Sequence, residues 1–150
     1  MYFDGEKTEA DRLPLARTER ETPLLAETKR WLDVYFSGGQ PDFLPPLHPA
    51  GSAFRQAVWA LLLQIPYGQT TTYGAIARQL AAKQGIPKMS AQAVGGAIGD
   101  NKIAIVIPCH RVIGANGSLT GYAGGMNRKA ALLELEHTDM TGLADKAKAY

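Results

Sequence analysis

The chain has 150 residues, of which 45% are hydrophobic and 20% charged, a composition typical of one ordinary globular domain. The formal net charge of +2 is compatible with nucleic-acid binding but does not indicate it. A single cysteine excludes an internal disulfide and a cysteine-rich metal site, and favours a reducing compartment. Because the N-terminus lacks a signal-peptide pattern and no apolar run approaches the ~20 residues of a membrane helix, we expect a cytoplasmic protein.

The first fifty residues are expected to form a reduced N-terminal region. Residues 1–21 are charged and irregular and predict a strand remnant followed by a linker. Thr22 as N-cap and Pro23 at the first helical position predict a helix that ends at Ser37-Gly38-Gly39. The next segment, 40–51, contains four prolines and is predicted to be an extended connector.

Three helices are expected next. Ser52 is predicted to cap a helix with a buried apolar stripe, which the Pro66–Gly68 break ends. Hydroxyls of 69–72 precede a short helix over 73–82, and Ser90 precedes a second one over 91–98. Two short helices joined by a glycine-containing loop have the form of a helix-turn-helix, although two packed helices of a small bundle remain an alternative.

The apolar run Ile103–Ile107 leads directly into Pro108-Cys109-His110-Arg111. Such a run predicts a buried strand, which Pro108 would end because it has no N–H to donate. A cysteine at a strand end, followed by a histidine, is a plausible setting for a thiolate nucleophile. A buried structural thiol is the alternative.

The C-terminal third is predicted to contain short elements. Val112-Ile113 can form a short strand, and Asn116-Gly117 indicates a turn. The glycine-rich loop 118–125 lacks the order of a phosphate-binding loop, which excludes a nucleotide site of that kind. A final helix is expected over 127–136, and 138–150 are expected to be a mobile tail.

The motifs, taken together, resemble the O6-alkylguanine-DNA alkyltransferases, also called methylated-DNA–protein-cysteine methyltransferases. The resemblance spans roughly 22–136, and the matching stretches are Phe54–Trp59, Ile65–Tyr73, Ala93–Ala97, Ile107–Ile113 and Gly121–Gly125. It implies an α+β fold: a mostly helical domain over 51–137, with a helix-turn-helix and a short strand or hairpin carrying the active-site cysteine, and a truncated N-terminal sheet domain. It also implies a suicide repair reaction, in which a flipped O6-alkylguanine of duplex DNA gives its alkyl group to the protein's cysteine.

The resemblance also implies roles for five catalytic residues. Alkyl transfer from oxygen needs a soft nucleophile, which a thiolate provides. Cys109 would accept the alkyl group, and His110 would deprotonate it through a bridging water. Glu136 would hold the imidazole, Asn101 would brace the turn around the cysteine, and Tyr73 would assist the departing guanine. From the residues alone, Glu136 and Asn101 could equally be ordinary helix and loop residues, and Tyr73 a packing residue.

DNA contacts follow from the same resemblance. Its matching positions for the base pocket and the duplex are Tyr122, Ala123, Gly124, Ala91, Gln92, Ala93, Gly95 and Arg111. Two residues depart from the family pattern, because Gln92 replaces the usual arginine finger and Lys102 the usual proline. We expect no metal, no cofactor and no membrane contact, and a monomer acting on DNA that contains O6-alkylguanine. A non-enzymatic sensor of alkylated DNA and a cysteine hydrolase stay open as alternatives.

Overall fold

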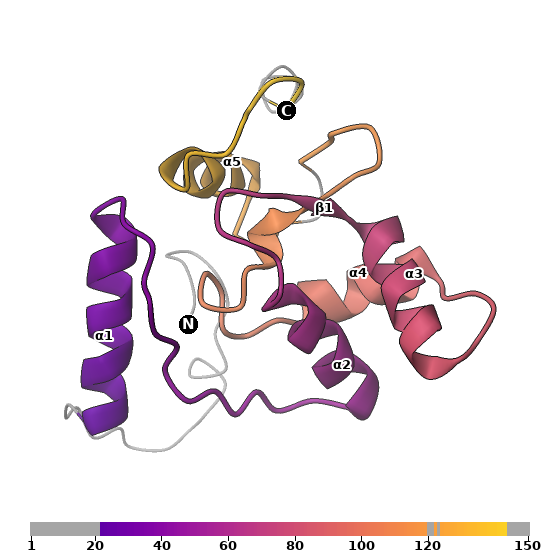
Figure 1. The fold of residues 1–150 in the computed structure, drawn as a ribbon, viewed down its shortest axis with the longest axis horizontal. Helices are drawn as coiled ribbons and strands as arrows, with labels where there is room; N and C mark the ends of the chain where they lie inside the picture. Colours follow the sequence, from indigo (N-terminus) through magenta and orange to yellow (C-terminus); the bar gives the residue numbers. More distant parts are fainter. Residues whose placement is uncertain (1–21, 120–121, 123, 144–150) are drawn as a thin grey trace.

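The computed structural model describes residues 22–119, 122 and 124–143, and shows an α+β fold (Figure 1). Within these residues, none of the helices has the length and apolarity needed to cross a membrane. The elements in chain order are α1 (Pro23–Phe36), α2 (Ala53–Leu62), β1 (Thr71–Thr72), α3 (Tyr73–Gln84), α4 (Ala91–Gly99), the 3-10 turn η2 (Cys109–Arg111), β2 (Val112–Ile113) and α5 (Met126–Leu135).

Hydroxyl caps start four of the helices at the predicted positions. Each cap oxygen accepts the backbone N–H three residues further on, at 3.0–3.2 Å, and the cap residues are Thr22, Ser52, Thr72 and Ser90. Such a bond satisfies one of the amides that a helix start leaves without a partner. The predicted starts of α1, α2, α3 and α4 are therefore confirmed.

The helices α2, α3 and α4 pack around one apolar core that also contains Cys109. A buried hydrogen bond of 2.9 Å from the indole of Trp59 to the carbonyl of Ala97 joins α2 to α4. The helix pair α3–α4, joined by the loop that starts at the left-handed Gly85, has the expected helix-turn-helix order.

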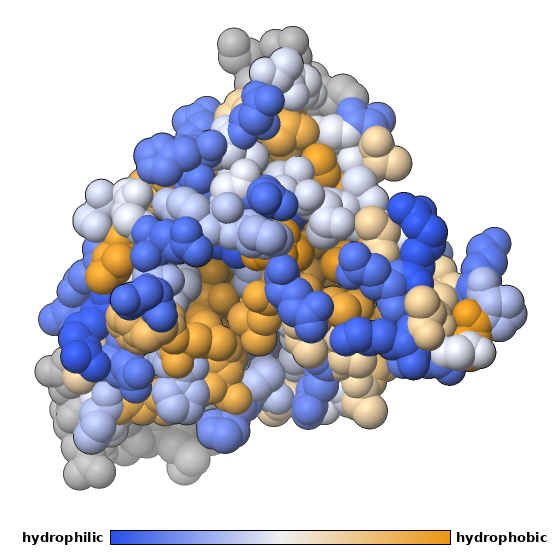
Figure 2. Space-filling view, in the orientation of Figure 1, coloured by the Kyte–Doolittle hydropathy of each residue, from blue (hydrophilic) through white to orange (hydrophobic). Residues whose placement is uncertain are grey.

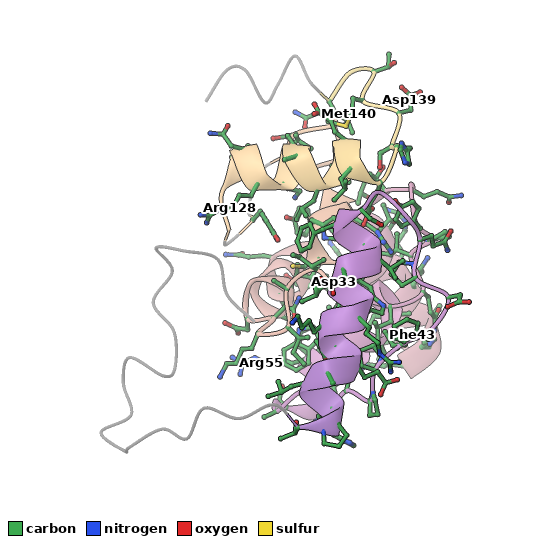
Figure 3. All side chains as sticks on the ribbon, turned by 90° about the vertical axis from the view of Figure 1, so that its left-hand side faces the viewer. Asp33, Phe43, Arg55, Arg128, Asp139 and Met140 are labelled. Carbon is green, nitrogen blue, oxygen red and sulfur yellow. The ribbon has the colours of Figure 1, made fainter. Side chains whose placement is uncertain are left out.

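Helix α1 lies apart from this core and contributes to a second apolar cluster. Its Trp31 and Tyr35 pack there against the turn 104–106 and Leu132 of α5. In Figure 3, α1 runs along one face of the molecule and α5 crosses beyond its end. Figure 2 shows hydrophobic side chains gathered in the middle of the face between α1 and α2, where a cavity of about 480 Å³ is lined in part by Trp31, Tyr35 and Tyr67.

The strand predicted for 103–107 is not formed. Ile105 has a φ of +72°, a left-handed conformation that a β-branched residue rarely adopts and that interrupts any strand. The backbone is instead paired within the segment, since Ile107 N–H donates to Ile103 O at 3.0 Å and Val106 N–H to Ala104 O at 2.9 Å. The apolar run does supply buried side chains, but as a folded turn.

The short strand β2 is confirmed, but it is not part of a hairpin. It pairs in parallel with β1, with Thr71 opposite Val112 and Thr72 opposite Ile113. The predicted turn at Asn116-Gly117 is closed by a 2.8 Å bond from Gly114 N–H to Ser118 O.

Two expectations concern the ends of the chain. The strand remnant and linker expected for 1–21 lie outside the described residues. Residues 138–143 begin the tail for which mobility is predicted, and Leu143 at their end is buried in an apolar cluster with Ile113, Leu119 and Leu133. The last seven residues of that tail, 144–150, also lie outside the described part.

Candidate active site

Cys109 begins η2, immediately before β2. Its side chain is only 7% exposed and belongs to the main core. Its N–H donates to Ile107 O at 2.8 Å, and the pairing of β2 with β1 holds the other end of η2. The thiol is therefore presented from a backbone that is anchored on both sides.

Asn101 braces the turn that leads to the cysteine. Its side-chain amide donates to Ile107 O at 2.9 Å, and its side-chain oxygen accepts the N–H of Ile103 at 3.0 Å. These two bonds close the irregular turn that replaces the predicted strand.

His110 and Glu136 form a buried pair. Neither side chain is exposed, and His110 Nε2 lies 2.8 Å from Glu136 Oε1. Burial raises the pKa of Glu136, but hydrogen bonds from His110 and Arg111 outweigh burial and lower it to about 2. An ionised carboxylate can only accept hydrogen bonds, so Nε2 must carry the proton of the imidazole.

That tautomer leaves Nδ1 of His110 as the basic nitrogen. Burial lowers the pKa of His110, more than contact with Glu136 raises it, so the ring is neutral near pH 7. Within the described residues, Nδ1 is buried and makes no hydrogen bond. A neutral histidine with a free basic nitrogen, adjacent in sequence to a thiol, can serve as a general base.

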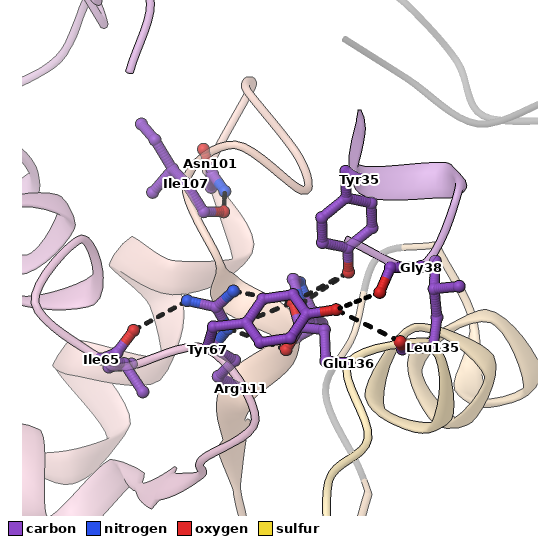
Figure 4. A network of polar contacts seen from close by, with 10 residues as sticks. Tyr35, Gly38, Ile65, Tyr67, Asn101, Ile107, Arg111, Leu135 and Glu136 are labelled. Carbon is purple, nitrogen blue, oxygen red and sulfur yellow. Dashed lines mark hydrogen bonds and ion pairs between the residues drawn. The ribbon is translucent and has the colours of Figure 1, made fainter. Parts of the chain in front are cut away.

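Arg111, for which a contact with DNA is predicted, is also part of this buried group. Its Nε and Nη2 donate to both carboxylate oxygens of Glu136 at 2.8–3.2 Å, and its Nη1 donates to Ile65 O at 2.7 Å (Figure 4). With 10% of the side chain exposed, its donors are committed to the protein interior. We refer to Tyr35, His110, Arg111 and Glu136 as the Glu136 network.

Lys129 of α5 was missed by sequence reasoning. It is completely buried, its ammonium donates to Val112 O, and it lies 5.9 Å from the centre of the Tyr73 ring. Burial lowers the pKa of Lys129 to about 8, against the opposing effect of Cys109. The residue is thus largely cationic at pH 7 beside the thiol, although the sequence around it, Asn127-Arg128-Lys129, is typical of an exposed helix start.

Tyr35 of α1 was missed as well. The sequence places it in the apolar stripe of its helix, which predicts a packing role only. In the structure, its hydroxyl donates to Glu136 Oε1 at 2.8 Å across 101 residues of chain. No signal in the sequence points to this contact.

Tyr73, the first residue of α3, is half-buried and packs against the core cluster that contains Cys109. Burial and the nearby Cys109 raise the pKa of Tyr73, so its phenol stays protonated near pH 7. Tyr122, in the loop after β2, packs against the same cluster.

Three of the eight predicted DNA-facing residues lie on the outer face of α4. Ala91, Gln92 and Ala93 are exposed, whereas Val94 and Ala97 face the core. A Cβ added at Gly95 would lie 3.8 Å from the Tyr73 ring, which places the α4 face next to that tyrosine. Gly124 is half-buried, and Ala123 lies outside the described residues. Within the described part of the chain, no three His, Cys, Asp or Glu residues are grouped as metal ligands would be.

Comparisons with known proteins identify close relatives. Residues 53–138 match the family model described as 6-O-methylguanine DNA methyltransferase, DNA binding domain. A methylated-DNA–protein-cysteine methyltransferase of Mycobacterium leprae is 50% identical over 124 residues, which cover 82% of this chain and 72% of that protein. One of Mycobacterium bovis is 55% identical over 105 residues, covering 70% of this chain and 61% of that protein. The fold is similar to a crystal structure of Mycobacterium tuberculosis OGT in complex with DNA, with a TM-score of 0.69, 48% identity, and coverage of 80% of this chain and 73% of that one.

Proposed function

The chain belongs to the family of methylated-DNA–protein-cysteine methyltransferases, enzymes of DNA repair by alkyl transfer, and on that premise we propose that Cys109 takes the alkyl group from O6-alkylguanine in duplex DNA. The observation that carries the proposal is the buried contact of 2.8 Å between Nε2 of His110, the residue that follows the only cysteine of the chain, and Glu136 Oε1. A thiol, a neutral base and a carboxylate that orients the base are the parts that an activated cysteine nucleophile needs.

In the proposed reaction, Nδ1 of His110 takes the thiol proton through a bridging water, and Glu136 stabilises the imidazolium that forms. The Cys109 thiolate then attacks the alkyl carbon. A carbon–sulfur bond forms as the carbon–oxygen bond breaks, and the electron pair of that bond passes to the guanine. The neighbouring Lys129 ammonium favours the thiolate over the thiol.

The departing guanine gains negative charge, which a hydrogen-bond donor must compensate. The protonated phenol of Tyr73 supports this role, because it packs against the cluster that holds Cys109. Tyr122, Ala123 and Gly124 are proposed to form the wall of the pocket that receives the flipped base.

DNA binding is assigned to the α3–α4 pair. The relative of known structure from M. tuberculosis was crystallised in complex with DNA. The exposed residues Ala91 and Ala93 are small and would allow the backbone of α4 to approach the duplex closely. Gln92 is proposed to take the place of the flipped guanine and to hydrogen-bond the orphaned cytosine.

The proposed reaction needs neither a cofactor nor a second subunit. The protein is proposed to act as a monomer. The thioether product is stable, so each molecule would react once. Because the thiol must stay reduced before it reacts, a reducing compartment such as the cytoplasm fits the proposal.

Mass spectrometry tests the proposal directly. The protein is incubated with a duplex oligonucleotide containing O6-methylguanine, and the intact protein and its peptides are weighed; Cys109→Ser serves as control. We expect one methyl group on the Cys109 peptide, at no more than one equivalent, and none on the variant.

The other outcomes would contradict the proposal in distinguishable ways. Tight binding of the oligonucleotide without a mass change would indicate a sensor of alkylated DNA. Conversion of several equivalents of substrate per protein would indicate a hydrolase.

A further inference from the structure

Helix α1 lies outside the stretch that matches the family model, yet one of its side chains reaches the site. Tyr35 is completely buried, and its ring is stacked on Trp31 with the ring centres 5.3 Å apart and an angle of 9° between the planes. Its hydroxyl donates to Glu136 Oε1 at 2.8 Å (Figure 4).

The oxygen that Tyr35 contacts is the one that also faces the histidine. Glu136 Oε1 accepts from His110 Nε2 at 2.8 Å and from Arg111 Nη2 at 2.8 Å, in addition to the phenol. The phenol oxygen itself lies 3.5 Å from His110 Nε2. Several donors therefore compete for the lone pairs of one carboxylate oxygen, so a bond to one of them leaves less negative charge for the others.

The phenol remains a donor over the whole working range of pH. Burial and the adjacent Glu136 raise the pKa of Tyr35 far above its ordinary value. The phenol therefore donates its hydrogen bond to the carboxylate at every pH of interest, whereas the charge of the imidazole that shares the same oxygen changes with pH.

We propose that Tyr35 is a positioning residue for the alkyl transfer: its phenol holds the Glu136 carboxylate against His110 and withdraws part of its charge, so that His110 stays a neutral base. This inference rests on the proposed function. The side chain makes helix α1 a functional part of the site rather than a separate layer.

Several other groups act on the histidine and are unchanged by an alteration at Tyr35. Glu136 raises the pKa of His110, whereas Arg111 and Lys129 lower it. Cys109 adjoins it in sequence, and the guanidinium carbon of Arg111 lies 5.8 Å from the centre of the Tyr67 ring. Removal of the phenol alone would leave Glu136 with more charge to share with His110.

The matched test compares Tyr35→Phe with Tyr67→Phe. Both changes remove one phenolic hydroxyl near the Glu136 network and keep the ring. The hydroxyl of Tyr67 donates to the backbone oxygens of Gly38 and Leu135 and not to Glu136. The rate of Cys109 methylation by the O6-methylguanine oligonucleotide is measured from pH 4.5 to 8, and the ring protons of His110 are titrated by NMR in the free protein.

In Tyr35→Phe, we expect His110 to take up its proton at a pH higher by about half a unit to one unit, because a hydrogen bond to a charged group has been lost. The acid limb of the methylation rate should move by the same amount, so that the rate on that limb falls about three- to tenfold. Tyr67→Phe should leave both curves in place.

An unchanged His110 titration in a folded Tyr35→Phe protein would overturn the inference. If Tyr35→Phe does not fold, 3-fluorotyrosine at position 35 provides the second variant: its more acidic phenol donates more strongly and should move the titration to lower pH, and no shift would again overturn the inference. Failure of the proposed function is a separate result, because the wild-type protein would then remain unmethylated while the NMR titration could still be measured.

Discussion

The Glu136 network and the outer face of α4 lie in one small protein but differ in almost every physical respect. His110, Arg111 and Glu136 are buried and are held by hydrogen bonds that join η2, the end of α5 and α1. Ala91, Gln92 and Ala93 of α4 are exposed and belong to one short helix. The first region is ordered before any substrate arrives, whereas the second offers small side chains and little charge.

This difference predicts how each region responds to change. In the buried network, an altered side chain leaves a charge without its partner, so stability, pH dependence and reactivity should all change. On the exposed face, an altered side chain is solvated, so only the affinity for DNA and its salt dependence should change. Substitutions can therefore test whether the two regions are as independent as their burial suggests.

The largest effect is expected for Glu136→Gln. The change leaves the buried Arg111 guanidinium without an anion, which should lower the free energy of unfolding at pH 7 by about 3–5 kcal/mol. The exposed Glu134→Gln on the same helix is the control and should unfold like the wild type. Urea denaturation measures both, and a loss below about 1 kcal/mol for Glu136→Gln would contradict the role given to the ion pair.

The same variant should lack an acid transition that the wild type shows. The pKa of Glu136 is lowered from 4.5 to about 2 in the folded protein. Its stabilisation is therefore complete above pH 4.5 and is lost as the pH falls towards 2. Urea unfolding at several pH values between 4.5 and 2 measures this. The free energies of unfolding of the wild type and of Glu136→Gln should become similar at the acid end of this range.

Lys129→Met is expected to change the stability less than Glu136→Gln, but to lower the reactivity of the Cys109 thiol clearly. Loss of the cation beside Cys109 should slow alkylation of the free protein by iodoacetamide at pH 7 about tenfold, because less thiolate is present. The free energy of unfolding should not fall much, since a buried charge is replaced by an apolar chain of similar length. The exposed Lys29→Met on α1 should react like the wild type; an equal slowing in both variants would contradict a local effect of Lys129.

The smallest effect is expected for Gln92→Arg on the α4 face. The added charge should make DNA binding tighter and steepen the dependence of log K on log salt by about 0.9, with no change in unfolding. Gln40→Arg adds the same charge to the exposed connector and should alter the slope less. Equal slopes for Gln92→Arg and the wild type would show that position 92 does not face the phosphates.

Local patterns in the sequence were enough to place the helices and the thiol. Hydroxyl caps and apolar periodicity depend on neighbours a few residues apart, and the starts of α1 to α4 were predicted from them correctly. The strand predicted from the apolar run before Pro108 was wrong, because a buried strand and a buried turn need the same apolar side chains. Only the bonds of Asn101 and the left-handed Ile105 distinguish the two.

By itself, the sequence determined an α+β domain with one cysteine, a histidine beside it and a helix pair before it, together with the family that these motifs resemble. Only the tertiary structure decided which distant side chains surround the thiol: it buried Lys129 near Cys109, turned Arg111 inward and brought Tyr35 to Glu136. The physical reason is range, since caps and periodicity act within a few residues of chain, whereas the charges in the core meet partners up to 101 residues away.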